Sequence, residues 1–428
     1  MGNGSLIKSV TAREIFSGRG HPSVEATVTT ENGAVGVGEA TAGLSIGEHE
    51  VRFAYDGGER WGGMGVLKAV GFVNDVIGPA LKGVDSANQF SVDSIMLELD
   101  GTPNKAKLGG NTTASVSAAT LKAAAASLGI PLYQHIGGAS ACLMPVPGVG
   151  ILNTIARYGG KAIHGDKPSY SFMAWGFGSF ADASYASWQV RRVYLKLLEE
   201  RFKLMNLASY RIVIPPGTVD HESEIWKVMS EAIERSGHAG RVGIQIDVAA
   251  ATYYNKAKHV YEGLFSEDAK SKEDMIGLYR DMVKRYPFVC LEDPLDENDY
   301  EGHAVLTRDL GIQVVGDDLF TTNPERLKTG MQVGACNAVL LKVNQIGTIT
   351  EAFETVRMAY ANGYGVQPCA SRGEGADIAD YAVGLGTGTI RESALDNTGN
   401  RLRKIELELG SRARFAGKAG FKTGPART

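Results

Sequence analysis

Four short apolar segments of this 428-residue chain each end on a charged residue. The four residues are Asp247, Glu292, Asp317 and Lys342, and the last three follow one another at intervals of 25 residues (317 − 292 and 342 − 317). A step of about 25 residues is close to the length of one strand plus its helix, so these charges should project from successive parallel strands. In a barrel of such units they would meet at the carboxyl-terminal face, where barrel enzymes build their active sites.

Three carboxylates that converge repel one another, so either their pKa values rise or a divalent cation neutralises them. A site made of carboxylate oxygens with room for water suits Mg²⁺. Lys342 beside such a cation would be poised to lose its proton and act as a base. The competing interpretation is a layer of ion pairs at the mouth of a barrel, without a metal. Three acids and a lysine at this spacing favour the metal site.

Two kinds of pattern divide the chain. Residues 5–39 alternate apolar and polar positions around a turn at 31–33, which predicts antiparallel strands, and helical stretches follow them. Later, short apolar runs alternate with helical segments, as in parallel strands covered by helices. Seven or eight such units favour a barrel over an open sheet. The sequence therefore predicts an α/β protein with a small N-terminal α+β domain over residues 1–140 and a barrel over residues 141–428.

Two segments carry local predictions of their own. The apolar run at 212–214 is expected to form one of the barrel strands. Residues 411–428 contain five basic residues and no acidic residue. We expect them to form a solvated, frayed terminus rather than a contact surface.

Charge and composition exclude several classes of function. Lys and Arg total 44 against 48 Asp and Glu, a formal net charge of −4, so the chain lacks the basic field of a general nucleic-acid binder. No segment approaches the ~18 apolar residues of a membrane span, and no secretory leader opens the sequence. The four cysteines are too far apart for a CxxC metal pair. Reduced thiols, and therefore a cytoplasmic protein, are expected.

Several longer strings give the charged residues a family context. They are LDGTPNK at 99–105, DVAA at 247–250, EDP at 292–294, VVGDDL at 314–319 and LLKVNQIG at 340–347. By these strings the chain resembles the enolase family, whose members convert 2-phosphoglycerate to phosphoenolpyruvate. The resemblance implies a small N-terminal α+β domain on a barrel whose second strand is antiparallel. It also implies a homodimer and two Mg²⁺ ions.

Matched positions carry the family's roles over to this sequence. The resemblance implies that Asp247, Glu292 and Asp317 bind the first Mg²⁺ and that Ser45 helps to hold the second. It also implies that Lys342 is the base that removes the proton from carbon 2 of the substrate.

The resemblance also implies an ion pair across the dimer interface. In the family, a glutamate of the first hairpin pairs with an arginine near the C-terminus of the partner. The matching positions are Glu25 and Lys404. Lysine keeps the charge but lacks the fork of donors, so the pair should be weaker and more sensitive to salt.

The departures from the family pattern gather in the same site. Two family strings supply glutamates that help to expel hydroxide; here they read RIVIPP at 211–216 and YSFM at 170–173, without a carboxylate. Hydroxide is a poor leaving group, and losing general acid–base help costs about 10²–10⁴ in rate. Little dehydratase activity should therefore remain.

The substrate-binding residues depart as well. The family string that holds the substrate reads CASRGE at 369–374, which moves its arginine by one place to Arg372. The substrate-binding lysine becomes Arg391, and the family's loop histidine is lost, with His164 nearby. Losing bidentate recognition of a phosphate removes charge-assisted hydrogen bonds and orientation.

Three hypotheses follow for the function. The leading one is an enolase-like protein that keeps its Mg²⁺ site and base and has little or no dehydratase activity. It would act as a binding or structural protein built on the enolase dimer, with an unidentified protein as a candidate partner. The second is a working enolase of glycolysis that binds its phosphorylated carboxylate substrate with His164, Arg372 and Arg391 as substitutes. The third is a barrel enzyme that enolises another carboxylate.

Overall fold

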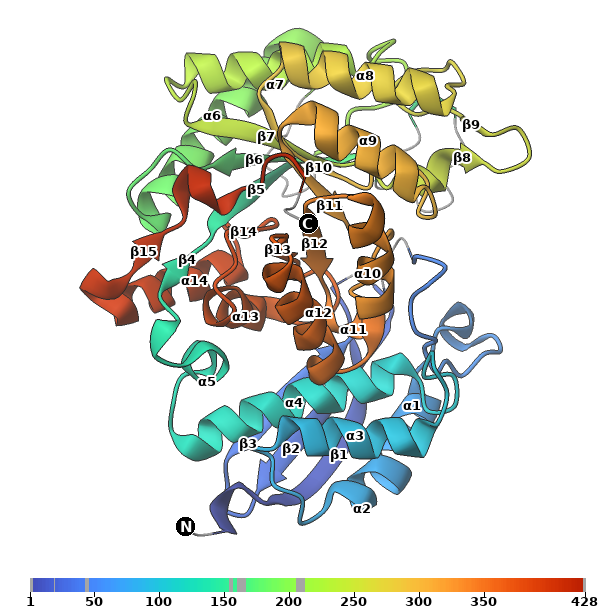
Figure 1. Cartoon of the computed structure of the whole chain (residues 1–428), viewed down its shortest axis with the longest axis vertical. Coiled ribbons are helices and arrows are strands. Elements are labelled where there is room, and N and C mark those ends of the chain that lie inside the picture. Colours follow the sequence, from blue (N-terminus) through green and yellow to red (C-terminus); the bar gives the residue numbers. More distant parts are fainter. Residues whose placement is uncertain are drawn as a thin grey trace.

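The computed structural model describes residues 3–18, 20–42, 46–153, 157–159, 167–204 and 212–425 of the chain. Its two main parts are a three-stranded sheet with its helices and an eight-stranded barrel ringed by helices (Figure 1). This is the small N-terminal domain followed by an α/β barrel that the sequence predicts. The boundary at residue 140 stays a prediction.

The N-terminal sheet is antiparallel, in the order β1-β2-β3. Its strands are β1 (Ile7–Phe16), β2 (Pro22–Thr30) and β3 (Val35–Ala40). Gly33 adopts a φ of 83° at the expected turn, where the Thr30 N–H donates to the carbonyl oxygen of Ala34 at 2.9 Å. Alternate residues of β2 (Val24, Ala26 and Val28) are fully buried. One face of the sheet therefore packs into a small hydrophobic core.

Five helices accompany this sheet. They are α1 (Leu67–Phe72), α2 (Gly78–Leu81), α3 (Gln89–Asp100), α4 (Gly110–Leu128) and α5 (Leu132–Gly137). The long α4 crosses the sheet and also touches the barrel (Figure 1). It approaches β3 closely, because Gly36 and Gly38 have no side chains to hold it away. The alanine-rich sequence of α4 matches this close packing.

The barrel closes on itself. Its strands are β5 (Val146–Asn153), β6 (Ser169–Ala174), β7 (Val242–Asp247), β10 (Phe288–Glu292), β11 (Gln313–Gly316), β12 (Ala338–Leu341), β13 (Gly365–Pro368) and β14 (Thr389–Ile390). Strand β6 runs antiparallel to both of its neighbours, as the family resemblance implies. β14 pairs in parallel with β5, and a bridge between Cys369 and Arg391 joins it to β13.

Helices surround the barrel on its outside (Figure 1). They are α6 (Phe180–Phe202), α7 (Ser223–Arg235), α8 (Lys272–Arg285), α9 (Tyr300–Leu310), α10 (Pro324–Val333), α12 (Ile349–Ala361), α13 (Ile378–Gly384) and α14 (Asn397–Leu409), with the single turn α11 (Val343–Ile346) after β12. Two short pairs complete the structure: β4 (Leu143–Met144) with β15 (Arg414–Phe415), and β8 (Tyr254–Asn255) with β9 (Val260–Tyr261). All four cysteines are free thiols, and Cys290 and Cys336 lie in the core.

The apolar run at 212–214 does not form a strand, so that prediction is wrong. Ile212 and Ile214 are buried in the core between the barrel and its helices, and Val213 between them is exposed. The Ile214 carbonyl oxygen accepts a hydrogen bond from the Arg157 side chain at 3.2 Å instead of a strand partner. Two prolines follow, and proline has no N–H for a strand ladder.

The C-terminal segment is also packed rather than frayed over its described part, which ends at residue 425. β15 pairs with β4, and Phe421 is buried in an apolar cluster with residues of five barrel strands. The Gly424 carbonyl oxygen accepts a hydrogen bond from Asn337 at 3.1 Å. The basic charge of the segment did not predict this packing, because the segment is held by the apolar contacts of its two phenylalanines.

Among the described helices, none by itself is long and apolar enough to cross a membrane. The segments Gly110–Leu128 and Leu132–Ser140 meet that test only together, as a pair bent by 94°.

The contact between α4 and β3 yields a first prediction. In Gly36→Ala, the new methyl group would overlap the backbone at Ala119 and Ala123. The free energy of unfolding in urea should fall by about 1–3 kcal/mol, the usual cost of overpacking.

Gly277→Ala is the matched control, because nothing lies within 4 Å of its added methyl group in α8. It should leave stability unchanged or raise it by about 0.5–1 kcal/mol. Equal stability of the two variants would contradict the close packing of α4 on the sheet.

Candidate functional site

The barrel brings the four strand-end charges together at one end. Asp247 and Glu292 are the last residues of β7 and β10, and Asp317 and Lys342 directly follow β11 and β12. All four side chains are buried, with 0–4% of each residue exposed. Because β7, β10, β11 and β12 are parallel neighbours, their carboxyl ends open onto one mouth. The four charges therefore lie at the ends of neighbouring parallel strands, as their spacing predicts.

Lys342 and Asp317 form a direct ion pair at this mouth. The ammonium Nζ lies 2.5 Å from Oδ2 of the carboxylate, and Gln345 donates to Oδ1 at 2.8 Å. Burial alone would raise the pKa of Asp317, but the Lys342 charge and these hydrogen bonds lower it to about 2. Burial would likewise lower the pKa of Lys342, yet Asp317 holds it above its ordinary value. Paired in this way, Lys342 keeps its proton.

Arg391 lies between the other two acids. Its guanidinium donates to Glu292 at 2.9 Å, to the hydroxyl of Ser169 at 2.9 Å, and to Asp247. Lys167 is a second cation on Asp247. Burial and the neighbouring Arg391 lower the pKa of Lys167 to about 8. Each of the three predicted acidic ligands is therefore paired with a basic side chain, as in the ion-pair interpretation.

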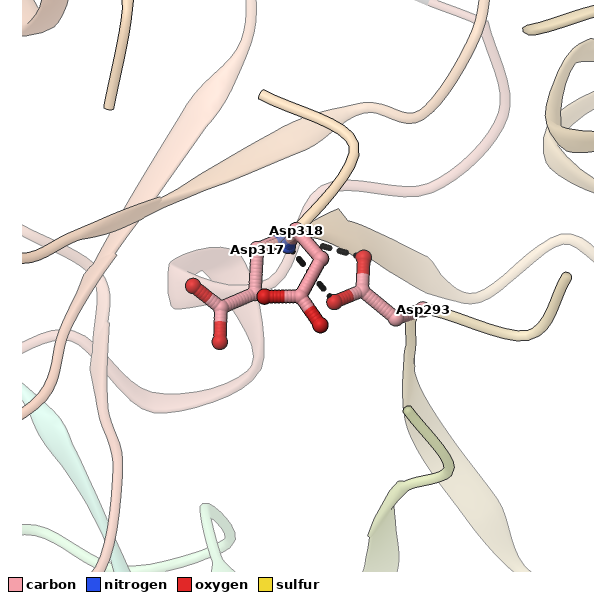
Figure 2. A group of neighbouring side chains, drawn as sticks. All are labelled: Asp293, Asp317 and Asp318. Carbon is pink, nitrogen blue, oxygen red and sulfur yellow. Dashed lines mark hydrogen bonds between the residues drawn. The ribbon is translucent and has the colours of Figure 1, made fainter. Parts of the chain in front are cut away.

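One group of three carboxylates does come together, and the sequence analysis missed it. Figure 2 shows Asp293, Asp317 and Asp318, whose nearest oxygens all lie within 4.8 Å of one another. The two oxygens of Asp293 accept the backbone N–H groups of Asp317 at 2.9 Å and of Asp318 at 2.7 Å. Burial and the adjacent acids raise the pKa of Asp293 well above its ordinary value and that of Asp318 to about 8. The doubled acids of EDP and GDD were the available signal.

This cluster fits a hard divalent cation. Its donors are all carboxylate oxygens, which Mg²⁺ prefers. Oδ1 of Asp318 is buried and has no hydrogen-bond partner among the described residues. Among the described residues, neither Asp293 nor Asp318 forms an ion pair with a basic side chain, and burial and the neighbouring acids raise the pKa values of both. Asp317 belongs to both sets, whereas ligation by Asp247 and Glu292 stays a prediction that requires Arg391 and Lys167 to move aside.

Arg372 has a different setting from the one expected. Its guanidinium forms a two-pronged ion pair with Glu50, and NH2 lies 2.6 Å from Oε1. The Arg372 carbonyl oxygen accepts from Asn344 at 2.7 Å and from the Thr41 N–H at 3.0 Å. These bonds tie Thr41 and Glu50 to the barrel mouth. Substrate binding by Arg372 stays a prediction.

The remaining predicted residues divide into two groups. Ser45 and His164 lie outside the described residues, as does Arg211. Ser171 is described and is buried in β6, where it pairs with Gln245 on one side and Gly150 on the other. Cross-strand partners point to the same face, and Gln245 reaches Glu292 at 3.4 Å inside the barrel. The inner face therefore carries a small hydroxyl at this position.

Fold and site together define a class: α/β-barrel proteins with a buried acidic, cation-binding site and a lysine at the carboxyl ends of the strands. Residues 7–136 match the model of the enolase N-terminal domain, and residues 141–423 match that of the enolase C-terminal TIM barrel domain. The chain belongs to the enolase family. That family uses Mg²⁺, and the acidic cluster provides buried oxygen ligands for it.

Similar proteins named enolase occur in archaea and bacteria. The enolase of Methanopyrus kandleri is 40% identical, over 97% of this chain and 99% of its own length. That of Methanocaldococcus jannaschii is 38% identical, over 96% of this chain and 97% of its own. That of Bifidobacterium longum is 38% identical, over 98% of each. The similarity extends over both parts of the fold.

The acidic cluster leads to a prediction about metal binding. Millimolar Mg²⁺ should raise the melting temperature, because a ligand that binds only the folded state adds about 2.7 kcal/mol at a hundred times its dissociation constant. The rise should vanish in Asp317→Ala, which removes the acid shared by both candidate ligand sets.

Asp281→Ala is the control for this measurement, since Asp281 is an exposed acid paired with Arg285 on α8. It should keep the full Mg²⁺-dependent shift. If Mg²⁺ does not change the melting temperature of the parent protein, the metal site is refuted.

Proposed function

We propose that this protein is an Mg²⁺-dependent enzyme that removes the proton next to the carboxylate of a phosphorylated carboxylate, with 2-phosphoglycerate as the first candidate substrate. One observation carries the proposal: the buried Lys342 ammonium lies 2.5 Å from Asp317 at the mouth of the barrel. A base must lie beside the positive charge that stabilises the enolate it forms, and Asp317, as a candidate Mg²⁺ ligand, would hold that charge next to Lys342.

The relatives support an active enzyme over the non-catalytic binding protein that the departures suggest. They carry the name enolase, at 38–40% identity over nearly the whole chain. Conversion of 2-phosphoglycerate, as in glycolysis, is therefore the first activity to examine, and a cytoplasmic location would suit it.

The chain's own groups divide the work. When bound at the acids, Mg²⁺ supplies positive charge that favours the enolate form of a carboxylate. Lys342 must first lose its own proton, and the pairing with Asp317 opposes this because it raises the pKa of the ammonium. The neutral amine then takes the proton of the substrate. Gln345 keeps Asp317 in place. The guanidinium of Arg391 contacts Glu292 and Asp247. We propose that Arg391 binds the negatively charged groups of the substrate.

A second candidate is enolisation of another carboxylate without loss of hydroxide. The observation in its favour is Ser171, which places no acid on the inner face where the family has a glutamate. The occupation of Arg372 by Glu50 points the same way, since it weakens the case for phosphate binding there.

Proton exchange separates these candidates. With Mg²⁺, the parent protein should exchange the carbon-2 proton of 2-phosphoglycerate with solvent deuterium, followed by NMR. Lys342→Ala should slow this exchange by about 10²–10⁴, the usual contribution of a general base.

Lys328→Ala is the control, because it changes an exposed lysine in the middle of α10. It should exchange the carbon-2 proton at the rate of the parent protein. Exchange together with an enol product supports the enolase activity, whereas exchange without it supports the second candidate. Absence of any exchange in the folded parent with excess Mg²⁺ would refute the proposal.

We also propose that the protein forms a homodimer through the N-terminal sheet and α14. Glu25 is largely buried and pairs with Arg13 across β1 and β2 at 2.6 Å, while Lys404 on α14 is exposed. The Glu25 carboxylate is thus already paired with Arg13 of its own chain. An ion pair with Lys404 of a second copy would be a second one on the same carboxylate.

Light scattering should give twice the chain mass at micromolar concentration in low salt. Lys404→Glu should weaken the dimer, because it sets a like charge against Glu25. A monomeric parent protein in low salt would contradict this assignment.

A further inference from the structure

Loss of hydroxide needs a proton donor, and the acids already described are poor candidates for it. Asp247, Glu292 and Asp317 are each paired with a cation. The other two acids of the cluster in Figure 2 are candidate Mg²⁺ ligands, so bound metal would keep them deprotonated. Ser171 offers a hydroxyl, which is a weak acid. A donor must be a carboxyl group that faces the mouth of the barrel and is not held by a basic partner.

Glu392 meets this description. It directly follows Arg391 at the end of β14, and it is half-buried. Among the described residues it makes no hydrogen bond and no ion pair. Its carboxyl group lies over the glycine of β5: a methyl group added to Gly150 would sit 3.6 Å from the carboxyl carbon and 3.8 Å from Oε1.

The neighbours of Glu392 explain why there is room for it. Gly150 is the cross-strand partner of Ser171, so two of the smallest residues lie side by side on the inner face. Gly148, on the same face of β5, would meet the Glu392 backbone nitrogen at 3.0 Å if it carried a methyl group. The carboxyl of Glu392 therefore reaches the region that the short Ser171 leaves open, but from the opposite side of β5.

The backbone of Glu392 is strained in order to hold this position. Its φ is +46°, in the left-handed region that non-glycine residues rarely adopt. Two hydrogen bonds secure the turn, from the N–H groups of Ser393 and Ala394 to the Gly148 carbonyl oxygen at 2.8 and 2.9 Å. Strain of this kind gathers at functional sites, where the surrounding structure maintains it.

Glu392 also lines an accessible cavity. The cavity measures about 370 Å³ and is bounded by residues of the barrel mouth and of the N-terminal sheet, among them Arg391, Cys369, Thr41 and Glu39. A small phosphorylated acid could enter it and meet Arg391 and Glu392 together. The strand-end acids lie beyond Arg391, which contacts both Asp247 and Glu292.

We propose that Glu392 is the proton donor to the departing hydroxyl group. This inference rests on the proposed function. Lys342 takes the proton from carbon 2, the carbon–oxygen bond at carbon 3 breaks with its electron pair on oxygen, and the Glu392 carboxyl proton completes a water molecule. Lys342 ends as an ammonium and Glu392 as a carboxylate, and proton exchange with solvent restores both.

The test measures two rates on the same proteins with 2-phosphoglycerate and excess Mg²⁺. One is exchange of the carbon-2 proton with solvent deuterium, and the other is formation of the enol product. Glu392→Gln keeps the shape of the side chain but cannot donate a carboxyl proton. Its exchange rate should stay within about threefold of the parent, while product formation should fall by about 10²–10⁴.

Asp281→Asn is the control, because it removes an exposed carboxylate on α8 that lies outside this cavity. Both of its rates should equal those of the parent. Product formation by Glu392→Gln at the parental rate would overturn the inference, as would an equal loss of both rates, which would make the role structural.

Two outcomes in the parent protein separate the inference from the function on which it rests. Exchange without any product would overturn the role of Glu392 and leave the base assignment of Lys342 standing. Neither exchange nor product in folded parent protein would overturn both.

Discussion

Neutralisation of buried negative charge is the constraint on which the rest of this structure depends. The carboxyl ends of three parallel strands present buried acids to one mouth of the barrel, and an isolated buried carboxylate is expensive. Lys342 is paired with Asp317, and Arg391 and Lys167 are both paired with Asp247. Where no basic side chain reaches, as at Asp293 and Asp318, burial and repulsion raise the pKa values instead.

The same constraint links the two parts of the chain. Glu50 comes from the N-terminal part and Arg372 from the barrel, and their buried ion pair is completed only when the two meet. Lys105 and Glu351 form a second pair across the boundary, at 2.6 Å. Asp93 on α3 accepts hydrogen bonds from Thr350 at the start of α12. The N-terminal part is thus held over the mouth by contacts that each satisfy a charge.

The sequence was informative where a pattern is local. A buried strand followed by an acid, repeated at one strand–helix interval, is visible without a structure, and Asp317 and Lys342 were found in this way. The antiparallel hairpins were visible because alternation and a glycine turn are short-range signals. The run at 212–214 failed because its composition suits a strand, while only the tertiary setting shows that no partner strand is there.

Contacts between distant residues could not be predicted. Arg372 and Glu50 are 322 positions apart, and Arg391 and Asp247 are 144 apart, so no spacing rule joins them. The pairing of Arg372 with Glu50 is one contact of this kind. The position of Glu392 could not be predicted for a related reason. Its neighbour Gly150 lies on the first barrel strand, and only the pairing of β14 with β5 brings the two residues together.

That closure has a consequence for how the protein is made. The first barrel strand, β5, finds its partner β14 only after some 240 further residues have been added (389 − 146 = 243), and β4 waits longer still for β15. A ribosome therefore releases nearly the whole chain before the ring can be completed. Until then β5 is an unpaired edge, the kind of surface that nascent chains must keep from pairing with one another.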